Sequence, residues 1–195
     1  MITNSRQQAM RCFISITLPE EIKRGMTAIQ GRLRASGADV SWTRPEGMHL
    51  TLKFLGEVEE KILPEMEAAL NAAVRGRSSF FLKVSGIGTF PDMRRPRVIW
   101  IALKEHGNNL IRLQRGVEEK FNEIGFPQED RDFTPHITLG RIRSQKNVEK
   151  LLSLIEKEKD VELNGFDASC VHLMQSQLKP TGAIYTELYS AGLQG

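Results

Sequence analysis

The sequence has few of the features that mark membrane, secreted or disulfide-bonded proteins. It contains two cysteines in 195 residues, Cys12 and Cys170, and neither lies in a CxxC pair or beside a histidine at metal-ligand spacing. The first residues do not form a basic leader followed by an apolar segment, and no run of about 18 apolar residues occurs anywhere. We therefore expect a cytoplasmic protein without membrane contact, in which both cysteines are buried free thiols.

Two common forms of phosphate chemistry also lack their signatures. No glycine-rich loop ending in Lys-Ser or Lys-Thr is present, which argues against nucleotide hydrolysis by a P-loop. No group of Asp, Glu and His residues has the spacing of a metal site, so the sequence predicts neither a metal ion nor another cofactor. The net charge of +3 is mildly basic, which suits a polyanionic partner without requiring one.

The hydrophobic pattern mixes short strands with amphipathic helices and predicts an α+β fold. Strands are expected over residues 12–18, 40–42, 48–55, 80–87, 97–103, 136–142, 166–178 and 183–189, and helices over 19–34, 64–74, 109–124 and 148–158. We expect largely antiparallel sheets with the helices on their outer faces. Residues 1–10 have no hydrophobic period and are expected to form a flexible tail, and residues 11–195 contain no linker and are expected to form one domain.

Two of the expected strands begin with the same pattern, His-x-Thr-Leu, at residues 49–52 and 136–139. Because strand side chains alternate between two faces, each histidine shares a face with the threonine two positions later, while the apolar residues point the other way. One such strand alone is typical of an ordinary half-buried strand with its polar face in solvent. Its recurrence in each half of the chain indicates two similar lobes that face each other.

A pair of histidines can cleave a phosphodiester without a metal. A neutral imidazole accepts a proton from the attacking water or hydroxyl, and a protonated imidazole donates one to the departing oxygen. Histidine titrates near neutral pH, so both forms are accessible. The hydroxyls of Thr51 and Thr138 can donate hydrogen bonds to phosphate oxygens, where negative charge develops. The sequence therefore predicts that His49, His136 and the two threonines surround one phosphate.

The two motifs and their flanking residues resemble the two-histidine phosphoesterase superfamily. Within it, the sequence is similar to the bacterial and archaeal RNA 2′,3′-cyclic phosphodiesterases, formerly named 2′-5′ RNA ligases. The resemblance covers nearly the whole chain and is carried by Arg11-Cys-Phe-Ile-Ser-Ile, Trp42, His49-Leu-Thr-Leu-Lys-Phe-Leu-Gly, Phe90-Pro91, Pro96-Arg97-Val-Ile-Trp and Phe133-Thr-Pro-His-Ile-Thr-Leu-Gly-Arg. It implies a bilobal fold with pseudo-twofold, duplicated lobes, whose antiparallel sheets line a central groove that holds the active site.

The resemblance also implies a role for each site residue. His49 would be the general acid that protonates the leaving 3′ oxygen, and His136 the general base that activates water, which leaves a 2′-phosphate end on the RNA. Thr51 and Thr138 would bind the phosphate.

Arg141 would add a cationic phosphate contact by the same resemblance. It lies five positions after His136, however, so strict alternation places it on the opposite face of the strand. We therefore expect a bulge or a strong twist at Gly140.

Further candidates for contact with RNA are basic or aromatic: Lys53, Arg94, Arg95, Arg97 and Trp42. Alternation places Lys53 on the His49 face, although a solvated lysine fits the sequence equally well. Phe54 and Trp100 are expected in the core. His106 and His172 have no threonine two positions later, and we expect them to be structural or surface residues.

Three alternative functions remain compatible with the sequence. The same site could cleave or form 2′-5′ phosphodiester linkages, or it could hydrolyse a small cyclic phosphate. The protein could also be an RNA-binding module whose histidines contact phosphate without catalysis. In the leading interpretation the protein is a monomer that acts on RNA with 2′,3′-cyclic phosphate ends, without metal or membrane.

Overall fold

The computed structural model describes residues 9–179 and 182–194. Their strands are β1 (Ala9–Thr17), β2 (Val40–Trp42), β3 (His49–Glu59), β4 (Phe80–Phe90), β5 (Val98–Lys104), β6 (His136–Ile142), β7 (Glu162–Ala168), β8 (Cys170–Lys179) and β9 (Gly182–Gly192). Their helices are α1 (Glu20–Arg34), α2 (Leu63–Val74), α3 (Asn109–Glu123) and α4 (Val148–Glu158), with single 3₁₀ turns at Pro45–Gly47 and Glu60–Ile62. None of the helices in this part of the chain is long and apolar enough to cross a membrane.

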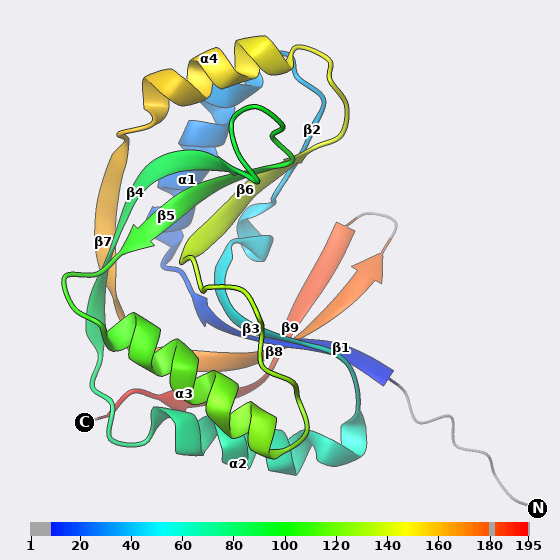
Figure 1. The fold of residues 1–195 in the computed structure, drawn as a ribbon, viewed down its shortest axis with the longest axis vertical. Coiled ribbons are helices and arrows are strands. Elements are labelled where there is room, and N and C mark those ends of the chain that lie inside the picture. The colour runs from blue at the N-terminus through cyan, green and yellow to red at the C-terminus, as the bar shows by residue number, and fades with distance from the viewer. Residues whose placement is uncertain (1–8, 180–181, 195) are drawn as a thin grey trace, which may run out of the picture.

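The strands form two antiparallel sheets, in the orders β3-β1-β8-β9 and β2-β6-β5-β4-β7. We call them sheet A and sheet B. Helices α2 and α3 pack against sheet A, whereas α1 and α4 pack against sheet B. Figure 1 shows the helices on the outside of both sheets, and β3 and β6 lie where the two sheets meet. The predicted α+β fold, with helices outside antiparallel sheets, is confirmed.

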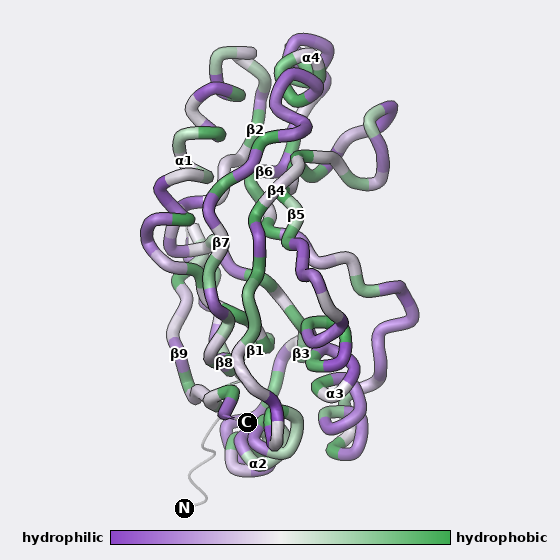
Figure 2. Tube along the Cα trace, turned by 90° about the vertical axis from the view of Figure 1, so that its left-hand side faces the viewer, coloured by the Kyte–Doolittle hydropathy of each residue, from purple (hydrophilic) through white to green (hydrophobic). Residues whose placement is uncertain are grey.

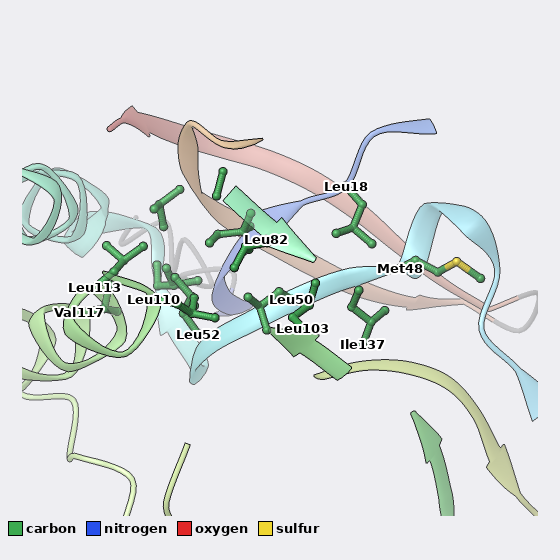
Figure 3. Close-up of a cluster of buried hydrophobic side chains, with 14 of the residues drawn as sticks. Leu18, Met48, Leu50, Leu52, Leu82, Leu103, Leu110, Leu113, Val117 and Ile137 are labelled. Carbon is green, nitrogen blue, oxygen red and sulfur yellow. The ribbon is translucent and has the colours of Figure 1, made fainter. Parts of the chain in front are cut away.

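The helical side of both sheets holds one continuous hydrophobic core. In Figure 2 the strands β1 and β5 are mostly hydrophobic, whereas the helices alternate between hydrophilic and hydrophobic residues, as expected when one helix face covers a sheet. The fully buried side chains include Leu50 of sheet A and Ile137 of sheet B, which lie near each other in Figure 3. Leu50 and Ile137 each lie between a His and a Thr in the strand. Because both are buried in the core, the His and Thr side chains must point to the opposite side of the sheet.

The two halves of the chain pair their strands in the same register. His49 lies opposite Thr17 and Thr51 lies opposite Ser15 where β3 pairs with β1. In the same way, His136 lies opposite Ala102 and Thr138 lies opposite Trp100 where β6 pairs with β5. Strand β1 is therefore equivalent to β5, and β3 is equivalent to β6, which is the relationship expected of duplicated lobes.

The lobes are not the two halves of the sequence. Sheet A takes β1 and β3 from the first half but β8 and β9 from the second, and sheet B takes β4 from the first half beside β5 and β6 from the second. Strand β2 of sheet B also comes from the first half, so each sheet contains two strands donated by the other half.

Some strand boundaries and the burial of one cysteine differ from the sequence expectations. Strand β1 begins at Ala9, so residues 9 and 10 belong to the fold rather than to the expected tail, and residues 1–8 lie outside the described residues. The single strand expected over 166–178 is two strands in different sheets, β7 and β8, separated at Ser169. Cys12 is buried as predicted, but Cys170 is only partly buried, and both are free thiols.

Candidate active site

The two His-x-Thr pairs lie on the side of the sheets that faces away from the helices. In both strands the histidine and threonine are partly exposed, while the residues between and after them are fully or almost fully buried. Leu50 and Ile137 belong to the shared core, and strand alternation therefore turns both polar pairs to the opposite side. We call this side, which carries His49, Thr51, His136 and Thr138, the histidine face.

A bulge brings Arg141 onto the histidine face. The register between β5 and β6 shifts so that Leu139 has no partner, Gly140 lies opposite Ile99 and Arg141 lies opposite Val98. One extra residue reverses the alternation, as the sequence required. Gly140 permits the close approach of β2, because a Cβ atom there would lie 2.7 Å from Val40 Cγ1.

The first motif has the same bulge, which sequence analysis did not predict. Leu52 is the unpaired residue of β3, and Lys53 lies opposite Ile14. Phe54 is therefore on the histidine face, where its ring lies 6.4 Å from that of Phe13 and 68% of the residue is exposed. The expectation that Phe54 belongs to the core is wrong, because it assumed unbroken alternation.

The same bulge sends Lys53 to the helical side. Its Nζ donates hydrogen bonds to Glu118 Oε2 at 2.5 Å and to the Pro127 carbonyl oxygen at 2.7 Å, and the residue is 5% exposed. Glu118 Oε2 also accepts a hydrogen bond from the Glu129 amide. Lys53 is therefore not placed to contact RNA, contrary to expectation, and instead ties β3 to α3 and to the segment before β6.

His49 is enclosed by aromatic rings. Its imidazole stacks on Phe13 at a centroid distance of 4.6 Å, and Tyr185 of β9 meets it edge-on at 5.3 Å. Burial lowers the pKa of His49 from its usual range to about 4, because few water molecules can stabilise the charged form. His49 is therefore neutral at pH 7 when no anion is nearby.

His136 is held by its backbone surroundings. Its Nδ1 lies 2.7 Å from the Thr134 carbonyl oxygen, an acceptor that requires a proton on Nδ1. In the neutral ring Nε2 then has a free lone pair. Phe90 meets the ring edge-on at 4.9 Å, which fixes the orientation of the imidazole.

Tyr185 of β9 covers His49 on the histidine face and was missed by sequence analysis. Burial raises the pKa of its phenol, while the nearby guanidinium groups of Arg141 and Arg11 oppose that rise. The Tyr185 ring also meets Phe13 edge-on at 5.8 Å, so it packs against both rings of the Phe13–His49 stack. Gly47 makes room for the ring, since a Cβ atom there would lie 3.2 Å from Tyr185 Cε2. No local motif marks this tyrosine.

His172 also lies on the histidine face, in contact with the first motif's neighbours. It is paired with Ser15 in the β1–β8 register. Its Nδ1 lies 2.7 Å from Glu187 Oε2 and its Nε2 lies 3.1 Å from Thr17 Oγ1. This arrangement supports the expected structural role of His172.

The remaining sequence candidates lie in different surroundings. Arg94, Arg95 and Arg97 are exposed, and the amides of the first two bond to Asp92 Oδ1 in the connector between β4 and β5. Their contact with RNA stays a prediction.

The two tryptophans lie on opposite sides of sheet B. Trp42 packs against the core on the α1 side, with Arg34 5.0 Å from its ring centroid, which argues against stacking on an RNA base. Trp100 was expected in the core, but it is only partly buried and lies over Gly88 beside Thr138.

In the described part of the chain, no three His, Cys, Asp or Glu side chains are grouped so that they could hold a metal ion. The chemistry of the histidine face is therefore that of imidazole, hydroxyl and guanidinium groups. These groups can bind a phosphate anion and move protons.

Comparison with protein-family models gives two matches to the LigT-like phosphoesterase model, at residues 16–100 and 101–185. The chain belongs to the LigT-like phosphoesterase family. The two matches meet at residues 100 and 101 of this LigT-like chain, within β5, which is the strand equivalent to β1. The resemblance to two-histidine phosphoesterases inferred from the sequence is therefore confirmed.

Relatives of this LigT-like protein occur in archaea and bacteria. A protein of Methanocaldococcus jannaschii is 38% identical over 176 residues, which cover 90% of this chain and 96% of the relative. A protein of Methanothermobacter thermautotrophicus is 36% identical over 179 residues, covering 92% and 96%. Both relatives are named RNA 2′,3′-cyclic phosphodiesterase.

Solved structures agree with the fold. The structure of TT0787 of Thermus thermophilus matches with a TM-score of 0.81 and 30% identity, and the match covers 95% of this chain and 99% of that one. Escherichia coli LigT, solved with 3′-AMP, matches with a TM-score of 0.75 and 24% identity over 96% and 100% of the two chains. The second match is informative about the fold alone.

Proposed function

We propose that this protein is an RNA 2′,3′-cyclic phosphodiesterase that opens the cyclic phosphate to a 2′-phosphate. The observation that carries the proposal is the repeated register, which puts His49 with Thr51 and His136 with Thr138 on one face of adjoining strands. The names of the relatives support the same substrate.

His136 is the general base in this mechanism. Its Nδ1 proton is donated to the Thr134 carbonyl, so the free Nε2 accepts a proton from water. The water oxygen forms a bond to phosphorus, and the bond between phosphorus and the 3′ oxygen breaks.

His49 is the general acid and donates a proton to the departing 3′ oxygen, so that the products are a 3′-hydroxyl and a 2′-phosphate. The pKa of His49 near 4 describes the site without an anion. A bound phosphate places negative charge beside the imidazole and favours its protonated form. Substrate binding therefore favours the protonated, proton-donating form of His49, whereas the aromatic enclosure keeps the imidazole neutral when no substrate is bound.

Thr51, Thr138 and Arg141 bind the non-bridging phosphate oxygens in this proposal. The bulge after each threonine puts Arg141 and Phe54 on the same face as the histidines. Arg141 supplies a charge-assisted hydrogen bond, and the exposed ring of Phe54 offers a stacking surface for the terminal base. One chain supplies both histidines, so we propose that the protein acts as a monomer and without a metal.

The test is a product assay on an oligoribonucleotide with a 2′,3′-cyclic phosphate end, with and without EDTA. We expect conversion to a 2′-phosphate that survives EDTA and falls at least about 10²-fold in His49→Ala and His136→Ala. Lys150→Ala is the control, because Lys150 is exposed on α4, which packs against the other side of sheet B from the histidine face. Parallel assays on a 2′-5′-linked oligonucleotide and a small cyclic nucleotide rank the alternative substrates. Full activity in either motif variant would overturn the mechanism.

A further inference from the structure

Strand β5 extends the histidine face past the catalytic histidine toward a second group of cations. Ala102 lies opposite His136, and Lys104 is two residues further along β5. The burial of β5 alternates without a break, with Ile101 and Leu103 in the core. Lys104 is therefore on the same face as Ala102, about 7 Å further along the strand. Figure 1 shows the end of β5 beside the start of β6.

A cavity of about 380 Å³ opens at this end of β5. It is lined by Lys83, Ser85, Lys104, Glu105, His106 and Glu162. Gly86, with a φ of 84°, forms part of an irregularity in β4 beside the cavity. The Lys104 ammonium lies over this glycine, 3.9 Å from the position that a Cβ atom would take.

Of the two lysines of the cavity, Lys83 forms a short ion pair, whereas Lys104 acts on Glu162 only through its charge at longer range. Lys83 and Lys104 lie directly opposite each other in the β4–β5 register, an arrangement of like charges that is unfavourable unless negative charge lies nearby. Glu162 pairs with Lys83 at 2.8 Å. Within residues 9–179 and 182–194, Lys104 forms no ion pair within 4.0 Å.

Glu105, the other acidic residue of the cavity, is engaged by the start of α3. Its carboxylate accepts hydrogen bonds from the Asn109 amide at 3.2 Å, the Asn109 side chain at 2.6 Å and the Leu110 amide at 2.9 Å. The position of this carboxylate is therefore set by the start of α3 rather than by an ion pair with Lys104.

Ser85 provides an independent sign that a ligand belongs here. The residue is 3% exposed, it lines the cavity, and its Oγ has no hydrogen-bond partner. A buried hydroxyl without a partner is costly. A rotation of this side chain toward the cavity would let its hydroxyl donate to an acceptor oxygen bound there.

The equivalent cavity of sheet A lacks these cations. It has a volume of about 230 Å³ and lies at the end of β1, where it is lined by Thr17, Pro19, Asp167 and His172 among others. Since Thr17 is equivalent to Ala102, Pro19 takes the place of Lys104. These two cavities therefore differ in charge, and the one in sheet B is the better suited of the two to an anion.

We propose that this cavity of Lys83, Ser85 and Lys104 binds a backbone phosphate of the RNA strand upstream of the cyclic end. The inference rests on the proposed function and adds the path of the strand, which crosses sheet B along β5. Lys104 contributes the charge and Ser85 a hydrogen bond to a phosphate oxygen. A mononucleotide has no upstream phosphodiester and cannot use this subsite.

The experiment compares nucleoside 2′,3′-cyclic monophosphate with a short oligoribonucleotide that carries the same end. For the oligonucleotide we expect Lys104→Ala to lower kcat/KM by about tenfold, as for one lost hydrogen bond to a charged group. It should also reduce the slope of log KM against log salt by about 0.7. Ser85→Ala should lower kcat/KM less, and Lys104→Glu more. All three should leave the mononucleotide unchanged within about twofold.

The matched control is Lys150→Ala, which removes the same charge from an exposed site on α4, the helix that covers the other side of sheet B. Equal losses on both substrates, or no loss on the oligonucleotide, would overturn the subsite. If the wild-type protein hydrolysed neither substrate, the proposed function would fail instead. Fluorescence anisotropy with a labelled 3′-phosphorylated oligoribonucleotide then tests the subsite. Lys104→Ala must still raise the Kd and reduce the dependence of the Kd on salt concentration, whereas Lys150→Ala must change neither.

Discussion

Phe54 occupies in sheet A the position that Arg141 occupies in sheet B. Each lies five residues after its motif histidine, and each reaches the histidine face because the leucine after the motif threonine is bulged out of the strand pairing. The duplicated frame thus presents one cation and one aromatic ring at equivalent positions. A nucleotide has an anionic and an aromatic part, so the pair matches its chemistry.

Phe54 should contribute to binding of the terminal base. We expect Phe54→Ala to raise KM for a nucleoside 2′,3′-cyclic phosphate by about tenfold, the effect of losing one aromatic stacking partner. Phe54→Tyr keeps the ring and should stay near the wild type, whereas Phe54→Leu keeps apolar bulk without the ring and should resemble alanine. Steady-state kinetics on the three variants checks this, and equal KM values for the tyrosine and leucine variants would contradict stacking.

Phosphate should raise the pKa of His49. In the free protein, the NMR titration of the His49 ring should have its midpoint at about 4. With a nucleoside 2′-phosphate bound, the anion should move that midpoint up by at least about one unit. An uncharged nucleoside is the control and should leave it in place. A midpoint that stayed at 4 with the phosphate bound would rule out His49 as the acid at neutral pH.

His49 should also make stability depend on pH. Because burial lowers its folded pKa, the unfolded chain binds a proton between about pH 6.5 and pH 4 that the folded protein does not. Stability should therefore fall as pH falls through this window, by at most about 3 kcal/mol from this group. Urea unfolding of wild type and His49→Gln measures it, and the variant should show a shallower loss. Identical pH dependence in both would refute the assignment.

Tyr185 should act in two separable ways. Its ring covers His49, and the charges of Arg141 and Arg11 act on its hydroxyl. Tyr185→Ala should admit water and raise the pKa of His49, whereas Tyr185→Phe should leave that pKa unchanged. If the hydroxyl contacts substrate, Tyr185→Phe should still lower kcat/KM by about tenfold. The titration of His49 in both variants measures how far the ring shields His49 from water, and steady-state kinetics on both variants measure whether the hydroxyl contacts substrate.

The buried Lys53–Glu118 pair should be important for stability. Lys53→Met leaves the Glu118 carboxylate buried without its cation, and we expect a loss of about 3–5 kcal/mol. The double variant Lys53→Met with Glu118→Gln also removes the unpaired carboxylate and should recover much of that loss of stability. Denaturant unfolding of the single and double variants tests this. A double variant no more stable than Lys53→Met would contradict the prediction, because the unpaired Glu118 carboxylate would then not be the cause of the loss.

Sequence analysis succeeded where a rule of strand geometry was sufficient. The alternation in each His-x-Thr-Leu strand placed the two His/Thr pairs on one face. The family resemblance put Arg141 on the same face, which required a bulge beside Gly140, and the structure contains that bulge. The first bulge was missed because Lys53 stands where the second motif has Gly140, so no glycine marks it. The repeated His-x-Thr-Leu motif could have predicted this bulge, because equivalent strands of duplicated lobes tend to have their bulges at equivalent positions.

Other features depended on contacts that are distant in the sequence. Tyr185 reaches His49 from the last strand, 136 residues away, and no local pattern encodes that approach. The break at Ser169 separates two runs of strand-forming residues with no proline or glycine at the break, because its cause is a change of sheet. Local propensity describes which residues are extended, but not which partner they choose.

The exchange of strands between the two halves has a consequence for how the protein can be divided. Cut between β4 and β5, the first fragment would keep β1 and β3 with the β8 edge of β1 open, and the second would keep β5 and β6 with the β4 edge of β5 open. Each fragment carries the strand that the other needs. We therefore expect neither piece to fold independently, and we expect two separated pieces to recombine as one molecule, each completing the sheet of its counterpart.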